Sequence, residues 1–520
     1  MTPEEFDAMV NRLERLARQQ PALYRFRVGI LAALGYIYIC LVLVLLFAII
    51  AALVKVVMSG YFNKLIVYLG VMVILVAFIT MRSLWVTIPP PSGIKLQHKQ
   101  APQLFTLVKE LISALQAPKF HHILLTNEFN AAVVQRPRLG VLGWQENYLL
   151  LGLPLMHALS PEQFRGVVAH ELGHLSGNHS RFAGWIYRVR KTWFNLLEHF
   201  EAGRQTAQDN IQLAAAVCGS LIFERFFNWY TPFFGAYSFV LARANEYEAD
   251  RCAVELAGAK NMAEALINVE VKARFLEKTF WPSVYKHVEV QPKPSNDTFK
   301  TMFVALRDQV ATEDSQKWLE QALAQKTNNV DTHPCLRDRL SALGYCPSQQ
   351  EELPPLPNSL KVTAAQQFLG VREPLFTSRL DCDWQKEIAP SWQQQFSYVQ
   401  ESKQRLQTLE QKAQNQPLTI EESWEQAQLT AEFKGHEAAI PLLLNIVSVQ
   451  PNHLAANSLL GQILLACNDA EGIHYIEKVM EQDANSIIPG CQLIYRFLKQ
   501  HGRTEEAQQY LDRAKRIHQL

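Results

Sequence analysis

Two uncharged apolar runs near the N-terminus dominate the pattern of hydrophobic and polar positions along the chain. Residues 28–54 contain no charged side chain, and after a short polar break residues 65–81 form a second uncharged run. The first run is long enough to span a bilayer, and the second is at the short limit. Neither run has a polar face, which disfavours the alternative of two buried core helices. The pattern therefore predicts a transmembrane hairpin, with spans at about residues 28–54 and 65–86, inside an N-terminal region of residues 1–93.

The charges around this hairpin predict its orientation. Five arginines lie within residues 1–27, whereas the polar break carries two lysines. By the positive-inside rule the N-terminus is cytoplasmic, and a hairpin returns the chain to the same side from about Pro89 onward. Eight scattered cysteines without a C-x-x-C pair also indicate a reducing compartment. We expect an integral membrane protein, in the cytoplasmic membrane if the source is bacterial, with everything after the hairpin in the cytoplasm.

Beyond the hairpin the periodicity changes to short helical and strand patterns. Residues 102–116 have the apolar spacing of an amphipathic helix. Residues 122–126 and 131–135 have the pattern of strands, and residues 148–152 form a third apolar run. Helical periodicity dominates the rest of the chain. The predicted fold class is therefore mainly α with a small β-sheet, an α+β arrangement.

The helix expected next, PEQFRGVVAHELGHLSGNHS, carries a compact set of titratable residues. Ser160 and Pro161 suit its N-cap and first turn. One helical turn separates His170 from His174, so both imidazoles face one way and can share a zinc ion. Glu171 lies about 100° round the helix, where it suits a general base toward water at the metal. The alternative is a chance match on an amphipathic helix, which would leave buried histidines in need of partners.

A zinc site of this kind needs a third protein ligand and keeps its fourth position for water. The nearest candidate is His179, nine residues after His170 and one residue short of the spacing in H-E-x-x-H-x-x-G-x-x-H. Glu246, in the helical pattern of residues 242–258, is the better candidate. Asp250 follows one turn later on the same face and can accept a hydrogen bond from a ligand histidine. The alternative for this stretch is a solvated acidic helix.

Residues 181–241 are unusually rich in aromatic side chains. Residues 211–223 are apolar enough for a further span, but Glu224 and Arg225 follow directly. Because that charged pair is unfavourable in lipid, we expect a hairpin that lies on the membrane surface or faces substrate.

The C-terminal part has a different composition. Residues 346–376 contain five prolines, which is typical of a linker. Residues 377–520 are helical, and similar segments begin at Gly435, Asn468 and Gly502. Their offsets of 33 and 34 residues match the tetratricopeptide period, so we expect a concave face that binds protein partners or substrates. The alternative is a plain helical cap.

A last element is DTHPCLRDRL, residues 331–340, in which His333 precedes a proline and Arg339 follows six residues later. His333 could donate a hydrogen bond to the oxyanion of a tetrahedral intermediate. Together these elements resemble metallopeptidase family forty-eight, which includes the HtpX heat-shock proteases and the CAAX prenyl endopeptidases. That family has H-E-x-x-H, a downstream E-x-x-x-D, and often a later H-P followed by Arg. The likeness runs from about residue 95 to 345.

The resemblance implies a gluzincin-type zinc domain, which we place at residues 94–345, with one Zn²⁺ per chain. The implied roles are metal ligation by His170, His174 and Glu246, catalysis by Glu171 and His333, and support of the ligands by Asp250 and Arg339. The segment Asn130, Ala131 and Ala132 is also similar, since in the family such a stretch leads an edge strand along which substrate lies extended. The chain departs from the prenyl-protease type because it has only two convincing spans and an added repeat-bearing tail.

The sequence thus predicts a membrane-anchored zinc endopeptidase acting on protein or peptide substrates, with a role by resemblance in membrane or protein quality control. One alternative is a specific processing protease for lipidated or signal-type peptides. Another is a catalytically silent scaffold, although a structural zinc site would need a fourth protein ligand and only Cys252 lies nearby. The net charge of +1 gives no indication of a nucleic-acid partner.

Overall fold

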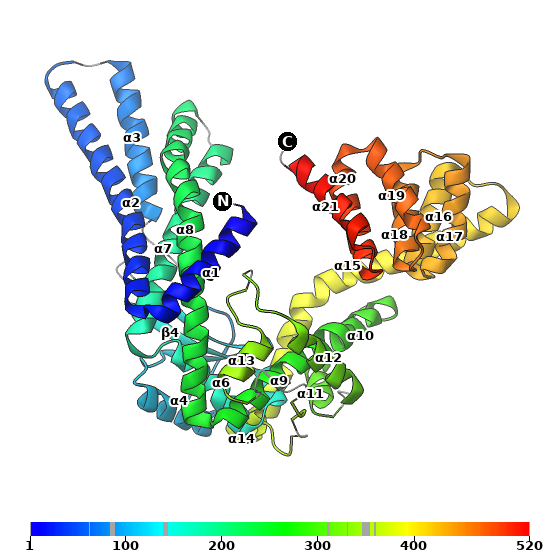
Figure 1. Ribbon diagram of the computed structural model, residues 1–520, viewed down its shortest axis with the longest axis horizontal. Coiled ribbons are helices and arrows are strands. Elements are labelled where there is room, and N and C mark those ends of the chain that lie inside the picture. Colours follow the sequence, from blue (N-terminus) through cyan, green and yellow to red (C-terminus); the bar gives the residue numbers. More distant parts are fainter. Residues whose placement is uncertain are drawn as a thin grey trace. The chain divides into compact units, whose positions relative to one another are not determined.

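The chain folds into two compact units. The computed structural model describes residues 2–61, 63–83, 89–138, 144–206, 209–308, 312–329, 331–345, 354–357 and 360–518. The first unit comprises Met1–Tyr285 and Ser295–Gln385, and the second comprises Lys286–Pro294 and Lys386–Leu520. Most of the described residues are helical, and a small mixed sheet lies in the first unit (Figure 1). The predicted fold class is confirmed.

Three helices open the chain, α1 (Pro3–Gln19), α2 (Pro21–Met58) and α3 (Lys64–Ser83). Among the described residues, α2 and α3 are the helices long and apolar enough to cross a membrane. Only 17% of the apolar window of α2 and 22% of that of α3 are buried. A core helix of a soluble protein would bury most of its surface, whereas a lipid-facing helix need not. The exposure of both helices therefore suits membrane anchors better than core helices.

A second helical hairpin packs along the first half of α2 (Figure 1). It consists of α7 (Gly177–Thr206) and α8 (Asn210–Ala257). Gly35 of α2 lies directly against the ring of Trp193, and the Tyr38 hydroxyl donates a hydrogen bond of 2.6 Å to the carbonyl of Ile222. The buried positions of α2 run from Tyr24 to Leu46. The hairpin therefore supports the part of α2 nearest the N-terminus, and a surface position for residues 211–241 stays a prediction.

The sheet has four strands in the order β1-β2-β4-β3. They are β1 (Ile94–Lys95), β2 (His122–Thr126), β3 (Ala131–Pro137) and β4 (Gln145–Gly152). Strands β2 and β4 are parallel, and the two outer pairs are antiparallel. The strands predicted at residues 122–126 and 131–135 and the apolar run at 148–152 all fall in this sheet, whereas β1 was not predicted.

Helices cover the sheet and complete the first unit. Helix α4 (Pro102–Leu115) is the predicted amphipathic helix, and α6 (Pro161–Gly173) begins after Ser160, whose side chain accepts a hydrogen bond from the backbone of Gln163. The remaining helices of this unit are α5 (Leu153–Ala158), α9 (Ala259–Phe275), α10 (Trp281–Lys286), α11 (Thr298–Asp308), α12 (Thr312–Ala324), α13 (Leu336–Ala342) and α14 (Ala364–Leu369).

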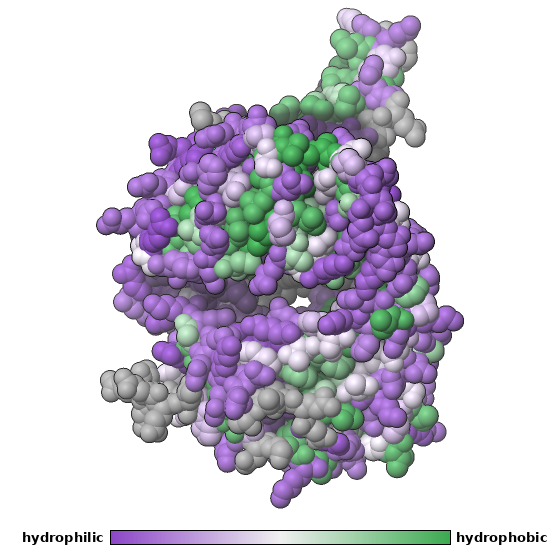
Figure 2. All heavy atoms as spheres, turned by 90° about the vertical axis from the view of Figure 1, so that its right-hand side faces the viewer, coloured by the Kyte–Doolittle hydropathy of each residue, from purple (hydrophilic) through white to green (hydrophobic). Residues whose placement is uncertain are grey.

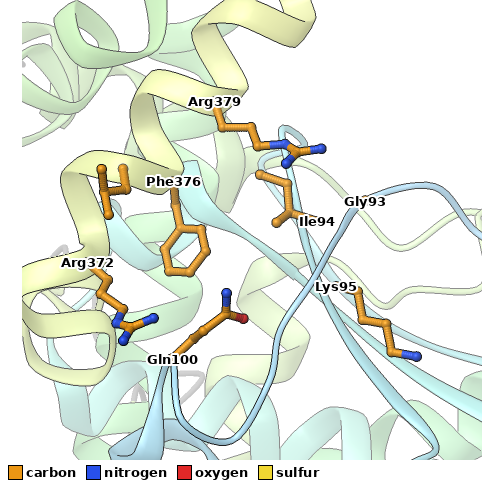
Figure 3. A pocket seen from close by; sticks show the side chains of 8 residues that line it. Gly93, Ile94, Lys95, Gln100, Arg372, Phe376 and Arg379 are labelled. Atoms are coloured by element: carbon orange, nitrogen blue, oxygen red, sulfur yellow. The ribbon is translucent and has the colours of Figure 1, made fainter.

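The second half of the predicted linker at residues 346–376 packs against the first unit. Helix α14 packs against α4, α5 and α6, because Ala364, Ala365 and Leu369 are apolar and buried. The backbone N–H of Ala364 also donates a hydrogen bond of 2.9 Å to the Leu159 carbonyl. Figure 3 shows the residues that follow, Arg372, Phe376 and Arg379, facing β1 across a pocket of about 400 Å³. Proline content alone could not reveal this apolar anchoring.

The second unit contains six shorter helices after α15 (Glu373–Asn415), which begins in the first unit. They are α16 (Ile420–Phe433), α17 (His436–Val449), α18 (Leu454–Ala466), α19 (Glu471–Gln482), α20 (Ile487–Gln500) and α21 (Thr504–His518). Gly435, Asn468 and Gly502, which the repeat alignment places at turns, all have left-handed backbone conformations between helices.

The helices of the second unit pack in successive pairs around small apolar cores. Their outer surface is mostly hydrophilic, and Figure 2 shows one apolar area within that surface. Exposed apolar side chains of this unit include Leu444, Val449 and Leu454. The tetratricopeptide assignment of the tail, like its role in binding partners, stays a prediction.

Candidate metal centre

Two helices, α6 and α8, bring three candidate ligands together. His170 and His174 lie one turn apart at the end of α6, and Glu246 lies in the C-terminal part of α8. Gly173 permits the close approach, because a Cβ at this position would lie 2.9 Å from the Cα of Ala249 on α8. The sequence motif predicted the histidine spacing, but nothing in it indicated that Gly173 is the contact point between the helices.

The three donor atoms form a small triangle. Nε2 of His170 lies 3.2 Å from Nε2 of His174 and 3.6 Å from Oε2 of Glu246, and Nε2 of His174 lies 3.5 Å from Oε1 of Glu246. Zinc bonds of about 2.0–2.2 Å in tetrahedral geometry place donor atoms roughly 3.3–3.5 Å apart. The observed separations fit such a site, and these residues are identified as a group that could hold a metal ion.

His174 and Glu246 offer donor atoms that suit a cation. Burial, and after it the neighbouring His170, lowers the pKa of His174 to about 4, so its ring is neutral and offers a lone pair. Within the described part of the chain, the buried Oε2 of Glu246 has no hydrogen-bond partner. A buried carboxylate oxygen without a partner is costly, and a bound cation would satisfy it.

Asp250 fixes the orientation of His170 from behind. Its Oδ1 lies 2.9 Å from Nδ1 of His170, and Arg339 of α13 donates to both of its oxygens over 2.6 and 2.9 Å. Burial opposes ionisation of Asp250, but the hydrogen bonds with His170 and Arg339 outweigh it and hold the carboxyl pKa at about 2. Because a carboxylate only accepts, Nδ1 of His170 carries a hydrogen, and Nε2 is the ring nitrogen that faces His174 and Glu246.

Glu171 lies next to this group but is not part of it. Burial, with a further contribution from the negative charge of Glu246, raises the pKa of Glu171 to about 7. The charges of His170, Arg339 and His333 act in the opposite direction, so all of these residues lie close enough to influence it. A carboxyl group with a pKa near neutrality can both accept and release a proton at physiological pH.

His333 reaches the same centre from the loop before α13. Its Nε2 lies 3.6 Å from Oε1 of Glu246, while its Nδ1 and its backbone N–H each lie 2.9 Å from Oδ1 of Asp331. The side chain is 60% exposed, so it stands at the open side of the centre. The structure therefore brings His333 to Glu246 and Arg339 to Asp250, and the roles predicted for His333 and Arg339 stay predictions.

Arg243 is a residue that sequence reasoning missed. It is buried on α8, pairs with Glu14 of α1 at 2.6 Å, and donates to the carbonyls of Asn328 and Asp331 and to the side chain of Asn329. It thus ties the loop that carries His333 to both α8 and α1. No sequence motif marks it, because its partners are distant in the chain and two of the four are backbone carbonyls.

The remaining predicted residues lie on β3 or outside the described side chains. Asn130 caps β3, since its side chain accepts a hydrogen bond of 2.9 Å from the N–H of Ala131 and its carbonyl accepts one from Gly152. In the described sheet β3 is an outer strand, which agrees with the predicted edge position of Ala131 and Ala132. The backbone of His179 belongs to α7, but its side chain lies outside the described residues.

Comparison with known proteins identifies this part of the chain. Residues 98–346 match the model of Peptidase family M48, which confirms the resemblance predicted from the motifs. No curated protein shows a significant sequence match to the chain. The matched region contains every candidate site residue, from Asn130 to Arg339.

Proposed function

Because residues 98–346 belong to peptidase family M48, we propose that this chain is a membrane-anchored zinc endopeptidase that hydrolyses peptide bonds of protein substrates. The observation that carries the proposal is the triangle of His170, His174 and Glu246, with Glu171 beside it but outside it. Three protein ligands leave one position open, which is the arrangement of a catalytic site. Cys252, the cysteine that the sequence offered as a fourth ligand, does not belong to this triangle.

His170, His174 and Glu246 would hold the zinc ion, and Asp250 with Arg339 would keep His170 in the correct tautomer. When bound, the ion supplies a Lewis acid that polarises the scissile carbonyl and makes water more acidic. Glu171 takes a proton from the attacking water and delivers it to the leaving amine. Its raised pKa suits both transfers, because the group must change protonation state twice in each turnover.

His333 would stabilise the negative charge that develops on the carbonyl oxygen. Asp331 binds Nδ1, so Nε2 can donate toward the substrate only when the ring carries both hydrogens. The carboxylate of Asp331 fixes the plane of the ring. Arg243 holds the loop in place through the carbonyls of Asn328 and Asp331.

An extended peptide would bind along β3. The outer edge of this strand offers backbone donors and acceptors to an added strand, and Asn130 fixes where the strand begins. Recognition through backbone atoms suits an enzyme that accepts many sequences. This supports turnover of misfolded or membrane-associated proteins as the biological role.

The membrane part of the proposal rests on α2 and α3, which would cross the bilayer as a hairpin with the N-terminus and the peptidase domain in the cytoplasm. The peptidase domain would then face protein substrates in the cytoplasm and at the cytoplasmic surface of the membrane. The exposed aromatic side chains Phe194, Trp229 and Phe233 on α7 and α8 favour one alternative, a processing protease for lipidated or signal-type peptides.

Substitution of Glu171 by Gln tests the proposal. Glu171→Gln should retain zinc, because the residue is not a ligand, and should lose cleavage of an unstructured peptide by about 10²–10⁴-fold. Glu162→Gln, in the first turn of the same helix, is the matched control and should cleave normally. Cleavage near the wild-type rate by Glu171→Gln would refute the assigned role and leave the silent scaffold as the better interpretation. Proteins that accumulate in a Glu171→Gln strain would identify the substrates and separate general turnover from specific processing.

A further inference from the structure

A large groove lies between α1, α2 and α8, on the first unit and outside the metal centre. Its volume is about 1240 Å³, above the roughly 300–1,000 Å³ of an ordinary small-molecule pocket. Apolar side chains from all three helices line it, including Leu13 and Leu16 of α1, Ile30 and Leu31 of α2, and Trp229 and Phe233 of α8. The size and lining favour an elongated apolar occupant.

Two cationic side chains stand in the same groove on different helices. Arg12 projects from α1 and Arg27 from α2, and both are exposed. Within the described part of the chain, no ion pair is found for either, whereas the neighbouring Arg25 lies 3.9 Å from Glu248. One acidic residue, Glu5, also lines the groove, but its carboxylate already accepts a hydrogen bond from the N–H of Thr2. The two guanidinium groups are therefore the main charges free to bind a ligand.

A third feature provides a polar acceptor on α8. Pro232 lies inside this helix and has no N–H, so the carbonyl of Asn228 cannot receive the usual helical hydrogen bond. Both residues line the groove. A ligand that carries a hydroxyl or ammonium donor near its negative charge could satisfy this carbonyl.

The groove also lies where the chain would meet the membrane surface. Arg27 directly precedes the uncharged run of α2, and Ile30 and Leu31 belong to that run. Trp229 is 58% exposed and Phe233 is 40% exposed, and aromatic side chains favour the boundary between headgroups and acyl chains. We propose that the groove binds one anionic phospholipid of the leaflet on the N-terminal side. Its phosphate would pair with Arg12 and Arg27, and an acyl chain would lie against Ile30, Trp229 and Phe233.

This inference rests on the membrane anchoring in the proposed function but not on peptidase activity. Arginine suits it because its planar guanidinium binds phosphate in a bidentate manner. A zwitterionic lipid offers the same phosphate, but the two arginines would repel its cationic headgroup, so an anionic lipid should be favoured by more than about tenfold. A free phosphate ion would use the arginines but not the apolar lining.

Native mass spectrometry of the full-length protein tests the proposal. The protein is released from detergent that contains equal amounts of phosphatidylglycerol and phosphatidylcholine with the same acyl chains. The wild type should retain one phosphatidylglycerol molecule in preference to phosphatidylcholine, and excess inorganic phosphate should not displace it. Arg12→Gln combined with Arg27→Gln should lose the preference. The control variant, Arg15→Gln combined with Arg18→Gln, also removes two positive charges, but from residues of α1 that do not line the groove. It should keep the preference for phosphatidylglycerol.

Ile30→Trp provides a second variant, since it fills the apolar part of the groove and leaves both arginines in place. It should retain less lipid of either kind. Equal retention of the two lipids by the wild type would overturn the proposal, as would displacement by phosphate alone. Equal loss of preference in the two double variants would show general attraction to a basic surface instead of a binding site. Complete extraction of the wild type by alkaline carbonate would instead contradict the membrane anchoring, whatever the result of the peptidase assay.

Discussion

Single side chains decide whether the centre can hold a metal, and the most informative of them is Glu246. It is the candidate acidic ligand, its buried Oε2 has no hydrogen-bond partner among the described residues, and it lies 3.5–3.6 Å from both histidine donors and from His333. His179 was the competing choice, and its side chain is outside the described residues. A metal measurement on variants can distinguish the two.

Glu246→Ala should strip or greatly weaken zinc binding, because it removes one of three ligands, while His179→Ala should keep the metal. Asp250→Ala should fall between them, with a loss of roughly 10–100-fold in affinity or activity, since it supports a ligand without being one. Metal content of the purified variants is the measurement. Full zinc in Glu246→Ala together with none in His179→Ala would reverse the assignment.

The residues of the centre differ in how far sequence could predict them. His170, Glu171 and His174 follow from spacing along one helix, and Glu246 with Asp250 from the same reasoning on another. Gly173 and Arg243 do not follow, because their roles depend on which helix and which loop pack against them. Asp331 lies two residues before His333, but only the folded loop shows that it binds both the ring and the backbone of that histidine.

At the scale of elements, α8 connects the apolar helices α2 and α3 to the candidate metal centre. Its N-terminal half packs against α2 and α3, and its C-terminal half carries Glu246 and Asp250. Arg243 lies at the junction, where it joins α1 and the loop before α13. The helix therefore sets the position of a candidate ligand and of the loop that faces it.

Arg243→Ala should retain zinc, because no ligand is removed, but should lower kcat by about 10–100-fold with little change in KM, because His333 would no longer be held in place. Arg251→Ala, an exposed position on the same helix, is the matched control and should leave kcat unchanged. Steady-state kinetics and metal content together provide the test. An unchanged kcat would show that the loop needs no support from Arg243, and loss of zinc would show that the residue supports the fold of α8 instead.

The β3–β4 pair should respond to acid through Glu146. Its carboxylate accepts hydrogen bonds from Arg138 at 2.7 Å, His122 at 3.1 Å and Arg136 at 3.2 Å, and chiefly the bond from Arg138 lowers its pKa to about 2. An unfolded glutamate titrates near pH 4.3. The folded pKa is the lower one, so this stabilisation is complete above pH 4.3 and is lost as the pH falls toward 2.

Glu146→Gln should therefore lower the melting temperature at pH 7 by about 2–4 °C and make it less dependent on pH between 4.5 and 2 than in the wild type. Thermal unfolding followed by circular dichroism across this pH range is the measurement. Glu128→Gln, at an exposed position before β3, should follow the wild-type profile. Identical acid profiles for the wild type and Glu146→Gln would show that the ion pairs contribute nothing to stability.

Several elements were predictable because local pattern determines them. The apolar runs of α2 and α3, the amphipathic spacing of α4 and the strands β2 and β3 all belong to this class. Strand β1 has only two residues and exists because it pairs with β2, so no local signal could reveal it. The packing of α7 and α8 on α2 depends on contacts such as Gly35 with Trp193, more than 150 residues apart in the chain.

At the scale of the whole molecule, the boundary between the two units is discontinuous. Lys286–Pro294 belongs to the second unit, where the Trp392 side chain donates a hydrogen bond of 2.8 Å to the Gln291 carbonyl and Lys403 pairs with Glu289 at 3.0 Å. The first unit in turn extends to Gln385, nine residues beyond the predicted end of the linker. A composition change marks where prolines gather, but it cannot show which of the later residues return to the first core.

The position of a C-terminal truncation should therefore decide whether the peptidase unit survives. A chain that ends at Gln385 should bind zinc and cleave a small unstructured peptide. A chain that ends at Phe376 should be less stable, because it loses Asp381, whose carboxylate accepts a hydrogen bond of 2.6 Å from the N–H of Phe299. It also loses Trp384, which packs against Phe299 and Trp281.

Zinc content, melting temperature and peptide cleavage of the two truncated chains, each compared with the full chain, are the measurements. The shorter chain should melt at a lower temperature, since removal of Asp381 leaves a buried backbone donor without its partner and removal of Trp384 exposes an aromatic cluster. Loss of zinc from the chain that ends at Gln385 would show that the C-terminal helices are needed for the peptidase fold. If that chain retains zinc and activity, the second unit is not needed for catalysis. Its role should then be sought in the recognition of partners or folded substrates.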